Sequence, residues 1–157
     1  MKKLFIITLL STIGFHGFSQ DSTHQKQLSA LLQSYFDIKN ALVAANASTA
    51  SLNAGSFIKM LNAFDTGIIT SRFAPSLLKD AAEISGSSDI RHQREHFATL
   101  STDFYSLAKA VKLTSQPLYY AYCPMKKVYW LSNEAAIKNP YYGNMMLTCG
   151  KVTETLQ

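Results

Sequence analysis

The chain has 157 residues, of which 47% are hydrophobic and 16% charged, with 15 Lys and Arg against 10 Asp and Glu. A chain of this length can bury a hydrophobic core without cross-links or structural metals, and it is close to the usual size of one domain. The basic excess is mild, and no cluster of Lys and Arg is interleaved with aromatic residues, which argues against nucleic-acid binding.

The first residues have the pattern of a secretory signal peptide. Lys2 and Lys3 give a positively charged start, and the apolar stretch from Leu4 to Ile13 is too short to span a bilayer comfortably. Ser19 is a small residue that suits the position before a cleavage site. We therefore expect a signal peptide over residues 1–19. The mature protein would be periplasmic or secreted, and we expect no membrane insertion after cleavage.

The remainder, residues 20–157, is predicted to form a single helical domain. Four stretches carry apolar residues at the spacing of an amphipathic helix. They run over residues 25–44, over 52–68 after turn and N-cap residues at 46–49, over 75–84 with a proline in the first turn, and over 97–111 after capping residues at 87–89. Because the connections are short, successive helices should be antiparallel neighbours in an up-down four-helix bundle.

The character of the sequence changes after Lys112. Residues 116–122 and 128–131 are rich in aromatic and other β-favouring residues, and prolines and glycines interrupt the chain around them. We predict two short strands or extended segments and a turn-rich loop, which together cover the bundle over residues 113–157. The predicted fold class is therefore mainly α, with an irregular, short-strand C-terminal segment packed on the four helices.

This C-terminal segment carries the two cysteines of the chain, each close to methionines. The strings are C-P-M at residues 123–125 and M-M-L-T-C at residues 145–149. Thiolates and thioethers are soft donors that select Cu(I) or a similar metal ion. In an exported protein Cys123 and Cys149 could instead form a disulfide, worth about 3 kcal/mol in the chain-entropy model. Unpaired buried thiols are a third alternative, and methionines are most often core residues.

Two histidines lie one turn apart on the fourth predicted helix. His92 and His96 share one side of that helix, which is a spacing suited to metal ligands but also common on helix surfaces. His96 borders the apolar stripe, so we expect it to face the C-terminal segment. No hydrolase or nucleotide-binding motif is present, and a Cys–His nucleophile pair would lack a third orienting residue. We therefore expect no enzymatic activity.

Several strings, taken in order, resemble the family called domain of unknown function 3347. They are Y-F-D-I-K-N-A-L-V-A at residues 35–44, R-E-H-F-A-T-L-S at 94–101, Y-C-P-M at 122–125, W-L-S at 130–132 and N-P-Y-Y-G-N-M-M-L-T-C-G at 139–150. The resemblance implies an exported protein of the kind that stands alone or is fused to periplasmic adaptor subunits of heavy-metal efflux systems. It supplies no demonstrated activity.

The resemblance also implies a set of metal ligands. The positions that match the family's pattern are His96, Cys123, Met125, Met146 and Cys149, whereas His92 is not part of it. The expected function is soft-metal, copper-type binding or handling, with an efflux adaptor or another exported protein as partner. The alternative is a non-catalytic structural or interaction module, stapled by a Cys123–Cys149 disulfide.

Overall fold

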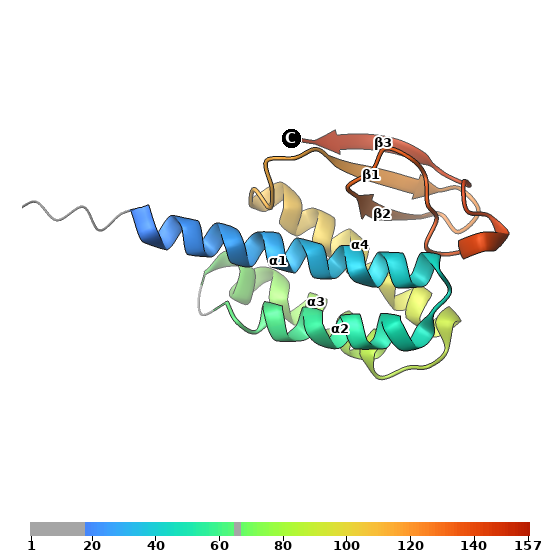
Figure 1. The fold of residues 1–157 in the computed structure, drawn as a ribbon, viewed down its shortest axis with the longest axis horizontal. Helices are drawn as coiled ribbons and strands as arrows, with labels where there is room; N and C mark the ends of the chain where they lie inside the picture. Colours follow the sequence, from blue (N-terminus) through green and yellow to red (C-terminus); the bar gives the residue numbers. More distant parts are fainter. Residues whose placement is uncertain (1–17, 65–66) are drawn as a thin grey trace, which may run out of the picture.

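The structure is a computed structural model that describes residues 18–64 and 67–157 (Figure 1). Nearly all of the predicted signal peptide lies outside the described residues. The helices are α1 (Phe18–Val43), α2 (Ala47–Leu61), α3 (Ala74–Ser85) and α4 (Ile90–Ala110), with a π-helical turn (Ile69–Phe73) before α3. The helices pack against one another, and the buried side chains of their apolar stripes form one core. The predicted mainly α class with a four-helix bundle is confirmed.

The helices begin where the sequence offers capping residues. Asn46 accepts a hydrogen bond from the Thr49 amide at 2.9 Å before α2, and Asp89 accepts one from the Arg91 amide at 2.8 Å before α4. The prediction that the second helix extends to Ile68 is wrong, because α2 ends at Leu61. Turn-forming residues follow Leu61, so the apolar positions beyond them belong to the π-helical turn and α3.

A three-stranded antiparallel sheet follows the helices. Its strands are β1 (Leu118–Cys123), β2 (Val128–Ser132) and β3 (Lys151–Leu156), in the order β2-β1-β3. Strands β1 and β2 form a hairpin in which Tyr120 pairs with Leu131. The two predicted strands are confirmed, and β3 was not predicted. Its inward positions include Glu154, which weakens the apolar alternation that marks a half-buried strand.

The sheet packs along the flank of the bundle beside α1 and α4 (Figure 1). The Tyr35 hydroxyl of α1 accepts a hydrogen bond from the Leu131 amide at 3.0 Å and lies 2.7 Å from Ser101 Oγ of α4. Tyr105 of α4 stacks on Tyr120 of β1, with ring centroids 3.8 Å apart. Aromatic packing and a buried hydroxyl therefore fix the sheet on the helices.

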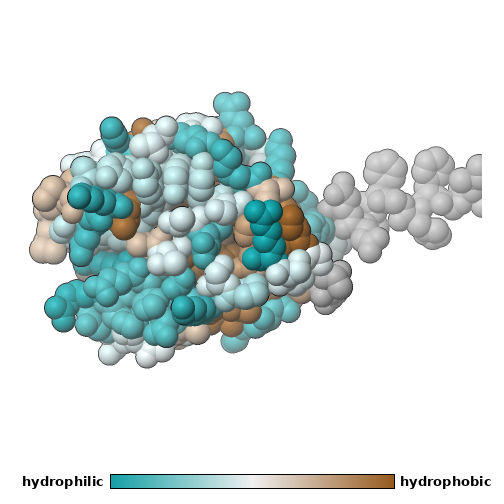
Figure 2. All heavy atoms as spheres, turned by 180° about the vertical axis from the view of Figure 1, so that it is seen from behind, coloured by the Kyte–Doolittle hydropathy of each residue, from teal (hydrophilic) through white to brown (hydrophobic). Residues whose placement is uncertain are grey.

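One face of the molecule is mainly hydrophilic (Figure 2). Figure 2 shows that hydrophilic residues cover most of that face, and hydrophobic residues appear there in small separate patches. Within residues 18–64 and 67–157, none of the helices combines the length and the apolar character needed to cross a bilayer.

Candidate metal centre between α3 and α4

The two cysteines of the C-terminal segment lie close together. Cys123 is fully buried at the end of β1, and Cys149 is half-buried just before β3. The side-chain amide of Asn139 donates to Cys123 Sγ at 3.2 Å and to the Cys149 carbonyl at 2.7 Å. Desolvation raises the pKa of the Cys149 thiol. The charge interaction and the hydrogen bond with Cys123 raise this pKa further.

Both cysteines are free thiols, so the predicted alternative of a Cys123–Cys149 disulfide is not formed in this structure. Cys123 Sγ is instead engaged as the acceptor of the amide of Asn139. Met125 lies in the exposed turn between β1 and β2, and Met146 lies half-buried at the end of a short 3-10 turn. A soft-metal site formed by these sulfur atoms stays a prediction.

His96, the remaining predicted ligand, points away from the sulfur atoms. We expected it to face the C-terminal segment, but its Nδ1 lies 2.8 Å from Asp80 Oδ1 of α3. The face of α4 that is turned toward the C-terminal segment carries Arg94, whose Nε donates to the Pro140 carbonyl at 2.8 Å. Residues two apart on a helix point in nearly opposite directions, so Arg94 and His96 cannot share that side.

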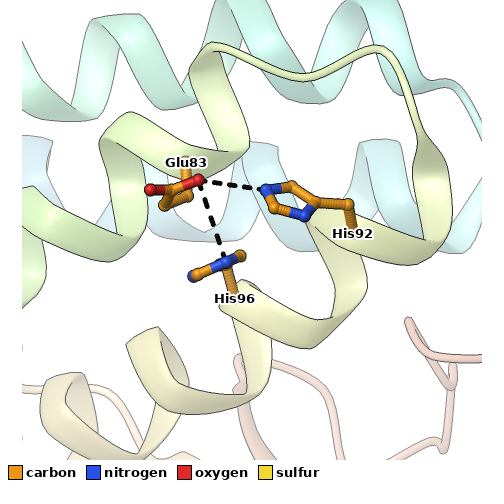
Figure 3. Close-up of side chains that lie close together, drawn as sticks. All are labelled: Glu83, His92 and His96. Carbon is orange, nitrogen blue, oxygen red and sulfur yellow. Dashed lines mark hydrogen bonds and ion pairs between the residues drawn. The ribbon is translucent and has the colours of Figure 1, made fainter.

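Three donor side chains converge between α3 and α4. Figure 3 shows Glu83 of α3 pointing toward His92 and His96 of α4. His92 Nε2 lies 3.1 Å and His96 Nε2 lies 3.9 Å from Glu83 Oε2, and the three ligand atoms all lie within 4.8 Å of one another. The side chains of His92 and Glu83 are 39% and 48% exposed, so the cluster is open to solvent.

Local helix geometry builds this cluster from two short patterns. Asp80 and Glu83 are three residues apart on α3, and His92 and His96 are four residues apart on α4, so each pair shares one helix face. The connection between the helices is short, and Gln93 helps to hold it. The buried amide nitrogen of Gln93 lies 3.2 Å from the Ile84 carbonyl and 2.6 Å from the Ser87 carbonyl.

Asp80 orients His96 from behind the cluster. Its carboxylate is only 7% exposed, and its Oδ1 lies within hydrogen-bond distance of His96 Nδ1. A proton on Nδ1 that is bonded to Asp80 leaves the lone pair on Nε2, and Nε2 is the atom that faces Glu83. Metal-binding histidines in proteins are held by a carboxylate in this way, which fixes the ring and raises its basicity.

The donor set fits a borderline divalent ion. Donors around a tetrahedral ion with bonds of about 2.0–2.1 Å lie about 3.3 Å apart. The observed separations of 3.1 and 3.9 Å from Glu83 Oε2 bracket that value, and the ligand nitrogens of the two imidazoles lie within 4.8 Å of each other. Two imidazoles and one carboxylate suit Zn²⁺, Cu²⁺ or Ni²⁺, whereas Cu(I) prefers sulfur. Three protein ligands leave the fourth position of such an ion open to water or to another molecule.

Sequence reasoning found only part of this cluster. It recognised the spacing of His92 and His96 but assigned no role to Glu83 or Asp80. The available signal was the succession D-x-x-E and H-x-x-x-H at residues 80–83 and 92–96, on two predicted helices joined by a short connection. Antiparallel neighbours bring the end of one such helix beside the start of the next.

Comparison with known proteins adds a family. The model of the family described as "Protein of unknown function (DUF3347)" matches residues 31–116, which is more than half of the chain. The matched range includes the three residues of the cluster and the supporting carboxylate of Asp80, and it ends before Cys123. No curated protein and no solved structure matches the chain. By the extent of the family match, the chain belongs to the DUF3347 family of proteins of unknown function.

Proposed function

We propose that this protein binds a divalent transition-metal ion, of the Zn²⁺ or Cu²⁺ type, through Glu83, His92 and His96. The observation that carries the proposal is the convergence of these three donor atoms within 4.8 Å, backed by the buried carboxylate of Asp80. Holding an ion requires no reaction, so the proposal is a binding function without catalysis.

Solvent exposure supports exchange of the ion rather than permanent structural use. The His96 side chain is 27% exposed and Glu83 48% exposed. Structural zinc sites are typically closed by four protein ligands, whereas this cluster supplies three. An ion held here would keep a position at which a partner's donor atom can attack. Copper-type metal handling with transfer to an exported efflux partner was expected from the sequence for Cu(I) at sulfur donors. At this cluster of nitrogen and oxygen donors, the same handling would involve Cu²⁺ instead.

The cluster differs from an ordinary ion pair between His and Glu on a protein surface. Such an exposed pair contains a single imidazole, and it contributes less than about 1 kcal/mol to the free energy of unfolding. The present arrangement places a second imidazole against the first, with ring centroids 4.6 Å apart. Two neighbouring imidazoles repel each other when both are protonated. Two neutral imidazoles and a carboxylate can instead bind one metal ion together.

Metal titration by isothermal calorimetry tests the proposal. Stoichiometric uptake of one Zn²⁺ or Cu²⁺ ion is expected, with proton release and weaker binding at acid pH, because the imidazoles must be neutral to bind. His92→Gln, His96→Gln and Glu83→Gln should each weaken the affinity more than about tenfold. The matched controls are His24→Gln on α1 and Glu95→Gln at an exposed position of α4 outside the cluster. Unchanged affinity in a His92→Gln, His96→Gln double variant would contradict the proposal.

A soft-metal site at the two thiols is a second candidate function. It is favoured by the shared contacts of Asn139, which hold Cys123 and Cys149 next to each other. Two thiolates can bind Cu(I) without further ligands, and Met125 or Met146 could add a thioether. Competition with a chromophoric Cu(I) chelator tests this idea. Uptake should disappear in a Cys123→Ser, Cys149→Ser variant and persist in the histidine variants; uptake lost only in the latter would refute it.

A further inference from the structure

A groove of about 550 Å³ opens between α4 and the C-terminal segment. Arg94 and Ala98 of α4 form one wall, and Lys126 and Val128 of the β1–β2 hairpin face them across the opening. This size falls in the range of small-molecule sites in proteins. The groove lies on the flank of α4 opposite to His92 and His96, so it is a different site from the proposed metal centre.

Arg94 is positioned in the groove without a counter-charge. Its Nε donates to the Pro140 carbonyl at 2.8 Å, and its Nη2 donates to the Leu42 carbonyl at 3.0 Å. Both acceptors are neutral, and within residues 18–64 and 67–157 no ion pair involves this guanidinium. Partial burial lowers the pKa of Arg94, which reflects the cost of desolvating its charge. These two hydrogen bonds fix the side chain without using Nη1, whose two N–H groups remain to donate to a ligand.

The other charges around the groove are mainly positive. Lys126 and Arg91 add two cations, and Glu95 is the one acidic residue of the lining. Arg91 is 85% exposed and contacts Asp89 at 3.5 Å, so it is only loosely engaged. Three cations against one carboxylate give the groove a positive potential that attracts anions.

The walls of the groove are apolar and aromatic. Ala98, Val128, Tyr142 and Met145 line it, and the Met145 side chain is 77% exposed. Apolar walls with a few fixed polar groups are typical of small-molecule sites, because the walls supply affinity and the polar groups supply orientation. An inorganic anion would use the cations but would leave these walls in water.

We propose that this groove binds a small organic anion, namely a carboxylate joined to an apolar or aromatic body. The carboxylate would lie between Arg94 and Lys126, where it would accept charge-assisted hydrogen bonds from Arg94 Nη1 and from the Lys126 ammonium group. The apolar body would lie over Ala98, Val128 and the Tyr142 ring. This binding needs neither the metal ion nor the two thiols, so the proposal does not depend on the proposed function.

Titration with phenylbutyrate, followed by calorimetry and by amide chemical shifts, tests the proposal. The full chain should bind phenylbutyrate, and phenylbutanol and inorganic phosphate should bind at least about tenfold more weakly, because each lacks one half of the recognised chemistry. Absence of binding at millimolar phenylbutyrate, or equal binding of phenylbutanol, would overturn it. Tighter binding of an acidic peptide than of phenylbutyrate would also overturn it, in favour of a protein partner.

The hairpin turn provides a matched pair of variants. Lys126→Gln removes a lining charge, and Lys127→Gln removes the neighbouring exposed charge that does not line the groove. The two variants change the net charge equally. Because both residues are exposed, we expect both variant proteins to fold. We expect about five- to tenfold weaker phenylbutyrate binding for Lys126→Gln and no change for Lys127→Gln. Equal effects of the two would mean that only the overall charge matters, which would refute the site.

A second pair tests the apolar wall. Ala98→Leu fills the groove from α4, whereas Ala110→Leu adds the same atoms at the exposed end of that helix. Binding should be lost in the first variant and retained in the second, with circular dichroism confirming that both are folded. The His92→Gln, His96→Gln double variant should bind phenylbutyrate normally. Loss of metal binding with retained anion binding therefore separates the two proposals.

Discussion

Replacing Tyr35 by Phe tests how the sheet is fastened to the bundle. β2 is an edge strand, and the Leu131 amide on its free side donates to the Tyr35 hydroxyl at 3.0 Å. The same hydroxyl lies 2.7 Å from Ser101 Oγ. The Phe ring would keep the stacking on Phe104 that the Tyr ring makes at 4.6 Å between ring centroids. The variant therefore isolates the hydroxyl in a site that is fully buried.

The loss follows from the groups that stay behind. The Leu131 amide would be buried without an acceptor, which costs about 1–3 kcal/mol, whereas the Ser101 hydroxyl can rotate toward a backbone carbonyl and loses less. We expect the free energy of unfolding, measured in urea, to fall by about 2 kcal/mol with an unchanged m-value. A Ser101→Ala, Tyr35→Phe double-mutant cycle should show a coupling of about 1 kcal/mol.

Tyr105→Phe is the matched control for this change. The Tyr105 hydroxyl donates to Glu154 Oε2 at 2.5 Å, but the residue is only half-buried, so water can replace the lost partner. We expect that variant to lose less than about 1 kcal/mol. If Tyr35→Phe costs no more than Tyr105→Phe, the hydroxyl does not fasten the sheet and the reasoning fails.

Three further predictions address the site, the backbone and the response to pH. Asp80→Asn keeps an acceptor for the neighbouring imidazole but removes its charge, so metal affinity measured by calorimetry should fall about tenfold while the fold persists. Gly143→Ala should lower the free energy of unfolding in urea by about 1–3 kcal/mol, because Gly143 has φ 55° and a Cβ there would lie 2.9 Å from the Val43 carbonyl oxygen. Burial raises the pKa of Tyr35, and desolvation raises the pKa of Tyr120 to about 12, from 10.0 in the unfolded chain. Their stabilisation is complete below pH 10 and is lost as the pH rises toward 12, so urea unfolding should become easier in that window; ionisation of all tyrosines near pH 10 without loss of structure would contradict this.

The helices could be predicted because their signals are local. Periodic apolar residues and the caps at Asn46 and Asp89 are written within each segment, and the structure uses them as predicted. The end of α2 was missed because apolar residues continue beyond it into the π-helical turn before α3. Strand β3 was missed because a half-buried edge strand tolerates Glu154 at an inward position, where Tyr105 and Lys109 of α4 satisfy the carboxylate.

The candidate metal centre depends on a relation between helices that single-segment patterns do not contain. The spacing of His92 and His96 is visible within α4. The contribution of Glu83 and Asp80 appears only when α3 is set antiparallel to α4 at the rotation that the core imposes. The same rotation overturned the expectation that His96 faces the C-terminal segment, since the apolar stripe that it borders has two flanks.

The buried stripe of α4 fixes both functional proposals at once. Phe97, Leu100 and Phe104 are fully buried, so rotation of α4 would expose large side chains at about 1.5–3 kcal/mol each. With the stripe inward, one flank must present His96 to α3 and the other must present Arg94 to the C-terminal segment. Neither site can be improved by turning the helix without damage to the other. The core therefore preorganises both sites. Because α4 cannot rotate, a ligand bound at one site cannot alter the other site by turning the helix.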